Sequence, residues 1–189
     1  MKKMNITHEY MYWGPLLFKS KVSDDIVDEL LTRGLKTKKS HRHKLAGHFK
    51  DEYLYSKDDM SWFVNKMKPY FLQHKHISEN VWYKSKCDPL QLTSLWINTM
   101  RAGDFNPPHT HDGELSFVIY LQVPDKIKAE FDSYEGRGKG YDGPGSVTFG
   151  IEFDATKKHT ISQHTFLPKV GDLFIFPANL PHYVAPFKC

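Results

Sequence analysis

The sequence predicts a mainly β protein with helices, an α+β fold, in a single domain. Its 189 residues fit the usual size of one domain. Residues 1–89 contain two segments with helical periodicity, whereas residues 90–189 contain short aromatic and β-branched runs separated by Gly, Pro, Asn and Asp. This second pattern is typical of β-sandwiches and barrels, so we expect an N-terminal helical segment over residues 1–89 followed by a β core over residues 90–189.

The first helix is expected over residues 24–33. Ser23 precedes two aspartates, which is the pattern of an N-cap residue followed by acids in the first helical turn. Apolar residues follow at helical spacing up to Gly34, where the helix is expected to end. A short extended segment within residues 10–19 should precede it.

A second helix is expected to begin near Asp58. Aromatic and apolar residues recur there at helical spacing, and packing in the core accounts for them. Pro69 should kink or shorten this helix, because proline removes a backbone donor and clashes with the preceding turn. The polar, basic stretch between Gly34 and residue 57 is predicted to be a loop.

Six strands are predicted in the second half of the chain, each bounded by turn residues. They span residues 91–101, 115–123, 146–153, 160–166, 172–176 and 182–186. The glycine-rich segment 134–146 neither opens a helix nor carries the Gly-Lys-Ser/Thr ending of a phosphate-binding loop. We therefore interpret it as a loop at the mouth of the β core.

The composition argues against several classes of protein. Net charge is +4 and the lysines are scattered, with only residues 36–44 concentrating basic side chains, so no nucleic-acid partner is expected. The chain has no run of about 18 apolar residues, and its N-terminus lacks the apolar stretch of a signal peptide. Cys87 and Cys189 lack neighbours with metal-binding spacing, which indicates free thiols in a reducing compartment. We expect a soluble, cytoplasmic protein that binds no membrane; the oligomeric state stays open, a dimer included.

The segment Pro-Pro-His109-Thr-His111 predicts a metal site. Side chains at positions i and i+2 of an extended segment point to the same face, so His109 and His111 can bind one ion. The two prolines favour the extended backbone that this requires. His182, which follows a proline-bracketed turn before the last predicted strand, is the expected third ligand. Three ligands leave coordination positions open, an arrangement that suits iron(II).

Asp112 is the alternative to His111 as a ligand. We favour His111, because the i, i+2 register places it on the same face as His109. The remaining histidines are expected to lie at the surface or at the flanks of a strand, away from the metal: His41, His43, His74, His76, His159 and His164.

These motifs resemble the 2-oxoglutarate/Fe(II)-dependent oxygenases of marine cyanophages and bacteria, relatives of the prolyl hydroxylases. Residues 90–189 carry the resemblance, through Trp-Ile-Asn98, the two-histidine segment and the run from Pro168 to His182. The earlier segment Leu45–Glu52 also resembles the family, less specifically. It implies a double-stranded β-helix, or jelly-roll, with the N-terminal helices packed on one side. It also implies Fe(II) and 2-oxoglutarate as cofactors of an oxidoreductase. Such a dioxygenase, acting in the host cytoplasm if a phage encodes it, would hydroxylate a C–H bond of a peptide, protein or small molecule.

Two features depart from the family pattern. The family motif is His-x-Asp/Glu, whereas this chain has His111 at the acidic position. The arginine that usually binds 2-oxoglutarate, about ten residues after the distal histidine, would lie beyond Cys189. We therefore expect a chain without its last strand, in which metal binding survives while 2-oxoglutarate binding and activity are impaired. The remaining candidates for contact with 2-oxoglutarate are Tyr120, Asn98 and Ser116.

Two other functions fit the same residues. The first is a cupin-like metalloprotein with a three-histidine site, an isomerase or another dioxygenase, and Glu114 close to His111 keeps it open. The second is a non-catalytic phage protein that retains only the jelly-roll. The loops at 36–50 and 134–146 are the expected substrate contacts, and we hypothesise that the second is a lid.

Overall fold

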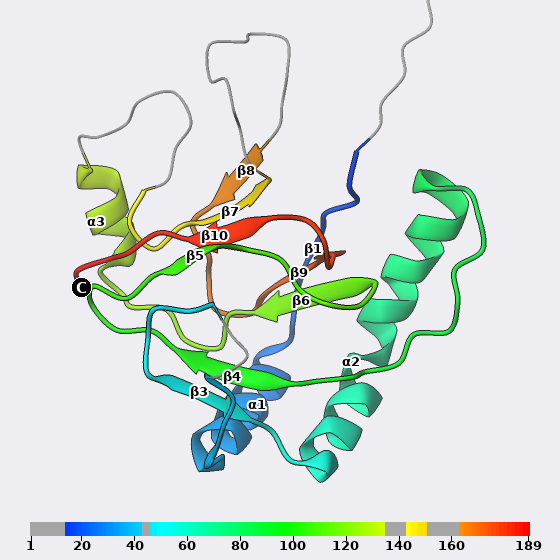
Figure 1. Cartoon of the computed structure of the whole chain (residues 1–189), viewed down its shortest axis with the longest axis horizontal. Coiled ribbons are helices and arrows are strands. Elements are labelled where there is room, and N and C mark those ends of the chain that lie inside the picture. The colour runs from blue at the N-terminus through cyan, green and yellow to red at the C-terminus, as the bar shows by residue number, and fades with distance from the viewer. Residues whose placement is uncertain (1–13, 43–45, 135–142, 151–162) are drawn as a thin grey trace, which may run out of the picture.

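The computed structural model describes residues 14–42, 46–134, 143–150 and 163–189 (Figure 1). The described helices are α1 (Asp24–Lys36), α2 (Lys57–Ile77), the π-helical turn η2 (Ser78–Trp82) and α3 (Ile127–Ser133). The described strands are β1 (Phe18–Lys21), β2 (Lys39–Ser40), β3 (Asp51–Leu54), β4 (Trp96–Thr99), β5 (Asn106–His109), β6 (Leu115–Ile119), β7 (Val147–Gly150), β8 (Gln163–Phe166), β9 (Asp172–Pro177) and β10 (His182–Val184). The expectation of a mainly β protein with few helices is confirmed. Within these residues no helix is long and apolar enough to cross a membrane.

The strands form three antiparallel sheets. Their orders are β1-β9-β6, β5-β10-β7-β8 and β2-β3-β4. The β1-β9-β6 sheet has a different core on each face, because alternate residues of a strand point to opposite sides. From β9, Leu173 and Ile175 join a cluster with residues of α1 and α2, whereas Phe174 and Phe176 join an aromatic cluster with Phe149 of β7.

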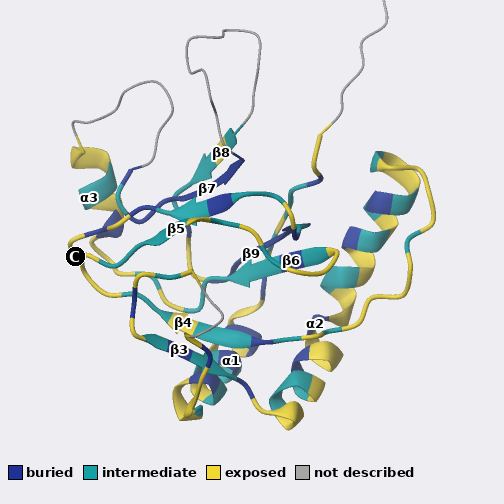
Figure 2. Cartoon of the chain, in the orientation of Figure 1, coloured by how far each residue is buried: buried dark blue, intermediate teal, exposed yellow. Residues whose placement is uncertain are grey.

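This alternation produces a layered arrangement. Helices α1 and α2 cover one face of the β1-β9-β6 sheet, and the β5-β10-β7-β8 sheet lies toward the other (Figure 1). Figure 2 shows buried residues along β7 and β9 and exposed residues on the outward surfaces of α1 and α2. The β1-β9-β6 sheet is therefore packed on both faces, which provides a rigid support for side chains at its edges.

Helix α1 starts where the sequence indicates, with Ser23 at the N-cap, but it does not stop before Gly34. It continues to Lys36 because Gly34 faces the protein interior. A Cβ atom added at Gly34 would lie 2.5 Å from both the Tyr55 hydroxyl and the Ile97 side chain. The Tyr55 hydroxyl donates a hydrogen bond to the Leu30 carbonyl at 2.9 Å. The glycine thus permits close approach of β3 and β4 to the helix and is not a stop signal.

Helix α2 begins with a capping box. The Ser56 hydroxyl accepts a bond from the Asp59 N–H at 3.1 Å, and the Asp59 carboxylate accepts one from the Ser56 N–H at 3.1 Å. The expectation that Pro69 shortens this helix is wrong, since the helix runs for 21 residues through it. Burial of Phe63 and Met67 before the proline and of His74 after it anchors both halves to the sheet. Packing therefore outweighs the lost hydrogen bond.

Each of the six predicted strands overlaps an observed strand, and β9 extends one residue beyond its prediction, to Pro177. The predicted residues 151–153 and 160–162 lie outside the described part of the chain. The predicted loop between residues 34 and 57 is wrong in part, because it contains β2 and β3, which pair with each other and with β4. Helix α3 was not predicted, and strand β5 was expected only as an extended segment before His111. The residues 135–142 of the glycine-rich loop, with His43 and His159, lie outside the described part of the chain.

Two histidines expected at the surface are buried. His41 is covered beside Trp96, with the two ring centroids 5.7 Å apart. His74 packs edge-on against Phe18 beneath α2, and neither of its ring nitrogens has a hydrogen-bond partner among the described residues. Periodicity could not distinguish these positions from surface ones, because a single polar residue hardly alters the apolar pattern around it.

Candidate metal centre

The three histidines of the predicted site come together at the edge of one sheet. His109 ends β5 and His182 begins β10, and the two residues are directly paired across the strands. His111 lies two residues beyond β5, where its backbone N–H donates to the Ala178 carbonyl at 2.9 Å. One ring nitrogen from each histidine lies within 4.8 Å of the other two. The loop after β9 thus fixes His111, while strand pairing fixes the other two residues.

Backbone carbonyls set the proton positions on two of the rings. Nδ1 of His109 lies 2.7 Å from the Pro107 carbonyl, and Nδ1 of His182 lies 3.0 Å from the Leu180 carbonyl. A carbonyl oxygen only accepts, so Nδ1 carries the proton and Nε2 of each neutral ring presents a lone pair. Histidines that bind metals are typically oriented in this way.

The distance between two of these nitrogens fits a shared ion. Nε2 of His111 lies 3.2 Å from Nε2 of His182. Two nitrogens bound at about 2.1 Å to one ion, at a right angle, are separated by about 3 Å. The donor set is chemically suited to a divalent transition metal, since imidazole binds iron, zinc and copper.

Burial keeps the histidines in the form that can bind a cation. It lowers the pKa of His109, an effect that the hydrogen bond to Pro107 opposes. Burial, together with the neighbouring histidines, lowers the pKa of His111 and of His182 to about 4 each. Nearby Asp112 opposes the shift at His111. At neutral pH each ring is therefore in its neutral form, with one nitrogen free to bind a cation, as ligation requires.

Aromatic side chains surround the site. The His182 ring lies 4.7 Å from that of Phe176 and 6.0 Å from that of Phe149, both members of the aromatic cluster. The Trp96 ring lies 5.7 Å from that of His111. These contacts limit rotation of the rings and reduce access of water.

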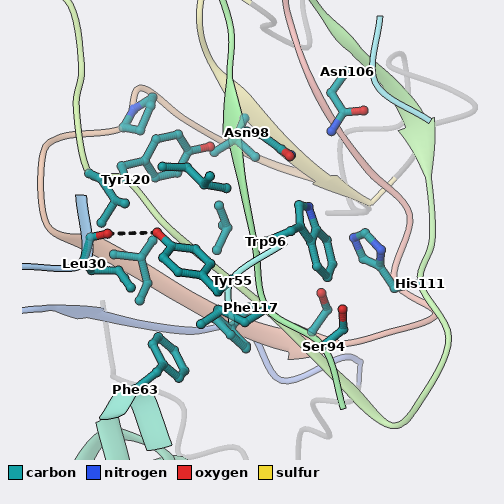
Figure 3. A pocket seen from close by; sticks show the side chains of 18 of the residues that line it. Leu30, Tyr55, Phe63, Ser94, Trp96, Asn98, Asn106, His111, Phe117 and Tyr120 are labelled. Carbon is teal, nitrogen blue, oxygen red and sulfur yellow. Dashed lines mark hydrogen bonds between the residues drawn. The ribbon is translucent and has the colours of Figure 1, made fainter. Parts of the chain in front are cut away.

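The three histidines line a cavity of about 1600 Å³. Figure 3 shows His111 on its wall. All three residues predicted to contact a cosubstrate line it too: Ser116 from β6, Tyr120 just after β6, and Asn98 from β4. Ser116 and Tyr120 are four residues apart and so share one face of that extended segment. Burial, with a contribution from Asp172, raises the pKa of the Tyr120 hydroxyl, which therefore stays a neutral donor.

Charged side chains are sparse on the described wall of the cavity. It contains no arginine, and its lysines are Lys68 and Lys75. Lys75 is engaged elsewhere, since it donates to the Cys87 carbonyl at 2.8 Å and lies 3.6 Å from Glu79. Asp112 is exposed and does not belong to the group of converging ligand atoms among the described residues.

Trp96 and Glu52 also belong to the cavity wall and were not predicted as site residues. Trp96 was noted only as part of a motif, and Glu52 only as the end of the family-like segment Leu45–Glu52 within a predicted loop. Glu52 is buried, and neither of its carboxylate oxygens has a hydrogen-bond partner among the described residues. The one sequence signal that could have indicated the orientation of Glu52 is the strand-like run Asp-Glu-Tyr-Leu54. His164, predicted not to bind metal, is exposed on β8 and lies outside the ligand group.

Comparison with known proteins identifies one family. The sequence model of the family described as "Putative 2OG-Fe(II) oxygenase" matches residues 94–189. The matched segment contains β4 to β10 and all three histidines. No curated protein matches the sequence.

Proposed function

Since the chain belongs to the 2OG-Fe(II) oxygenase family, whose cofactors are Fe(II) and 2-oxoglutarate, we propose that it is a hydroxylase with its iron bound by His109, His111 and His182. The observation that carries this proposal is the convergence of three ring nitrogens within 4.8 Å on the wall of a large cavity. Three protein ligands leave the open positions that a cosubstrate and O₂ require.

The cofactors supply the oxidising power when bound: 2-oxoglutarate and O₂ become succinate and CO₂, with one oxygen atom inserted into a substrate C–H bond. The protein supplies orientation and shielding. The carbonyls of Pro107 and Leu180 hold two imidazoles with Nε2 toward the ligand group. Phe149 and Phe176 exclude water behind His182.

We assign the third ligand to His111 in place of the acid that the family motif usually has. Its ring nitrogen belongs to the converging group, and exposed Asp112 does not. With three neutral histidines, the net charge of the iron site is one unit more positive than with two histidines and a carboxylate. Extra positive charge strengthens attraction for an anionic cosubstrate such as 2-oxoglutarate.

Tyr120, Ser116 and Asn98 are the proposed contacts of 2-oxoglutarate. Their hydroxyl and amide groups line the cavity that the histidines share. Each can donate a hydrogen bond to a carboxylate, and such bonds to a charged group are stronger than neutral ones. Substitution of Tyr120 by Phe should therefore weaken 2-oxoglutarate binding without changing iron binding.

The fold that this function requires is a double-stranded β-helix in one domain. Two observations support it: the β1-β9-β6 and β5-β10-β7-β8 sheets share the aromatic cluster, and α1 and α2 cover the outer face of the first sheet. A cupin-like metalloprotein would also use three histidines. The oxygenase is favoured because Glu114, the residue that suggested a cupin, is exposed and outside the ligand group of the described chain.

The test is succinate formation coupled to O₂ uptake by the iron-loaded protein. We expect slow turnover of 2-oxoglutarate without substrate, and loss of that turnover in His109→Ala and His182→Ala. His164→Ala is the matched control, since it removes an exposed histidine of β8. Absence of succinate from protein shown to contain iron, or full turnover in His182→Ala, would contradict the proposal.

A further inference from the structure

Glu52 is a carboxylate in the interior of the protein, without a hydrogen-bond partner in the described part of the chain. It lies in the middle of β3, is 1% exposed and lines the same cavity as the three histidines. Neither oxygen has a hydrogen-bond partner among the described residues. Burial raises its pKa, and the positive charge of Arg42 opposes this shift. A buried charged group without a partner costs free energy, which a bound ligand of opposite charge would recover.

Strand pairing determines which way Glu52 points. Glu52 is directly opposite Asn98 of β4, so the two side chains share a face, and Trp96 lies two residues along on that same face. The other face carries Ile97, which approaches Gly34 of α1 closely. The face with Glu52 is therefore turned away from α1.

The face of β3 and β4 that carries Glu52 and Trp96 is directed toward the three histidines. The ring of Trp96 is 5.7 Å from the ring of His111, and Figure 3 shows Trp96 between Asn98 and His111. Trp96 is a diagonal neighbour of Glu52, and such neighbours are about 7–8 Å apart. A group of moderate size can therefore contact both the carboxylate and the indole.

The chemistry of this wall selects a cation. A carboxylate forms strong, charge-assisted hydrogen bonds with ammonium and guanidinium groups. The face of an indole attracts the same groups through its quadrupole. The Asn106 side-chain oxygen, also on the cavity wall, is buried and lacks a partner among the described residues, so it adds another acceptor.

We propose that Glu52 and Trp96 form a cation subsite that binds the ammonium or guanidinium group of the substrate. The substrate assignment rests on the proposed function. If the protein is a hydroxylase, its substrate contains a lysine- or arginine-like side chain, and a C–H bond of that side chain is hydroxylated near the iron. The binding itself requires only the cavity and the side chains of β3 and β4.

Binding of matched peptides to the full-length, iron-loaded protein tests the subsite. The probes are acetyl-Gly-Lys-Gly-amide and its norleucine analogue, and acetyl-Gly-Arg-Gly-amide and its citrulline analogue. We expect at least one cationic peptide to bind about 10- to 100-fold more tightly than its neutral analogue in calorimetric titrations. Glu52→Gln, which preserves shape, should remove this preference, and Trp96→Leu should reduce it about two- to fivefold.

Asp125→Asn is the control for general electrostatics, because Asp125 is an exposed acid that lines the same cavity. It should leave the preference for a cation unchanged. Equal binding of charged and neutral peptides, no binding of any probe, or a preference that persists in Glu52→Gln would overturn the proposal. Thermal melting of Glu52→Gln establishes that the variant is folded.

The experiment separates failure of the subsite from failure of the proposed function. Peptide binding is measured without turnover, and succinate formation is measured without peptide. Selective cation binding without succinate would retain the subsite and reject the hydroxylase. Succinate formation without selective binding would retain the hydroxylase and reject the subsite.

Discussion

Separate substitution of His111 and of Asp112 should show which of the two residues is the third ligand of the iron. The perturbations are His111→Ala and Asp112→Asn, compared in separate proteins. The His111 nitrogen is 3.2 Å from that of His182, within the spacing expected for ligands of one ion. Asp112 is exposed and affects His111 through its charge.

The two changes should differ greatly in magnitude. Structural zinc sites with four ligands bind with about 10–16 kcal/mol, which corresponds to about 3 kcal/mol for each ligand. Loss of His111 should therefore weaken iron binding about 100-fold. Loss of an exposed charge beside the site is worth about 1 kcal/mol at most, so Asp112→Asn should change the affinity less than about fivefold.

Anaerobic titration of Fe(II) against a competing chelator measures both affinities. His111→Asp provides a second comparison, because it restores the acidic residue of the family motif at the same position. It should bind iron more tightly than His111→Ala. A larger loss in Asp112→Asn than in His111→Ala would refute the reasoning and identify Asp112 as the ligand.

Three further predictions concern stability, measured by urea or thermal unfolding of the metal-free protein. Glu52→Gln should stabilise the fold by about 2 kcal/mol, or about 4–8 °C, because it removes a buried carboxylate that has no hydrogen-bond partner among the described residues. Since the folded-state pKa of Glu52 is raised, this gain should grow as the pH rises above about 4.5 and vanish below it. Gly34→Ala should cost about 1–3 kcal/mol despite the higher helix propensity of alanine, because its Cβ would collide with Tyr55 and Ile97. Burial lowers the pKa of His74, so the unfolded chain takes up its proton first, and stability should fall as the pH drops below about 6.5. His74→Phe should reduce that acid sensitivity; an unchanged pH profile would contradict the argument.

Local sequence patterns were sufficient to predict the geometry of residues that depends only on neighbours a few positions away. The i, i+2 relation of His109 and His111 follows from an extended backbone, and the prolines before it favour that backbone. The N-cap at Ser23 is similarly local. The direct pairing of His109 with His182, by contrast, joins strands more than 70 residues apart in the sequence, and no periodicity indicates such a register.

Where local propensity and packing disagree, packing decides. Gly34 and Pro69 both appeared to end helices, yet both lie inside them. The free energy of burying apolar residues on either side exceeds the propensity penalty of about 1 kcal/mol for glycine and about 3 kcal/mol for proline. Strand β2, only two residues long, carries too little pattern for recognition from sequence.

With the proposed subsite, the site would be divided between the two halves of the chain, which would explain why the family alone does not indicate a substrate. The family match begins at residue 94 and includes the histidines, whereas Glu52 lies outside it on β3. Strand β3 reaches the cavity by pairing with β4 beside Trp96. The matched half would then hold the metal and the cosubstrate, while the preceding half would add the charge that selects the substrate. Substitutions in β3 and its neighbours could therefore alter substrate specificity while the histidines stay unchanged. In this way one fold can serve different reactions.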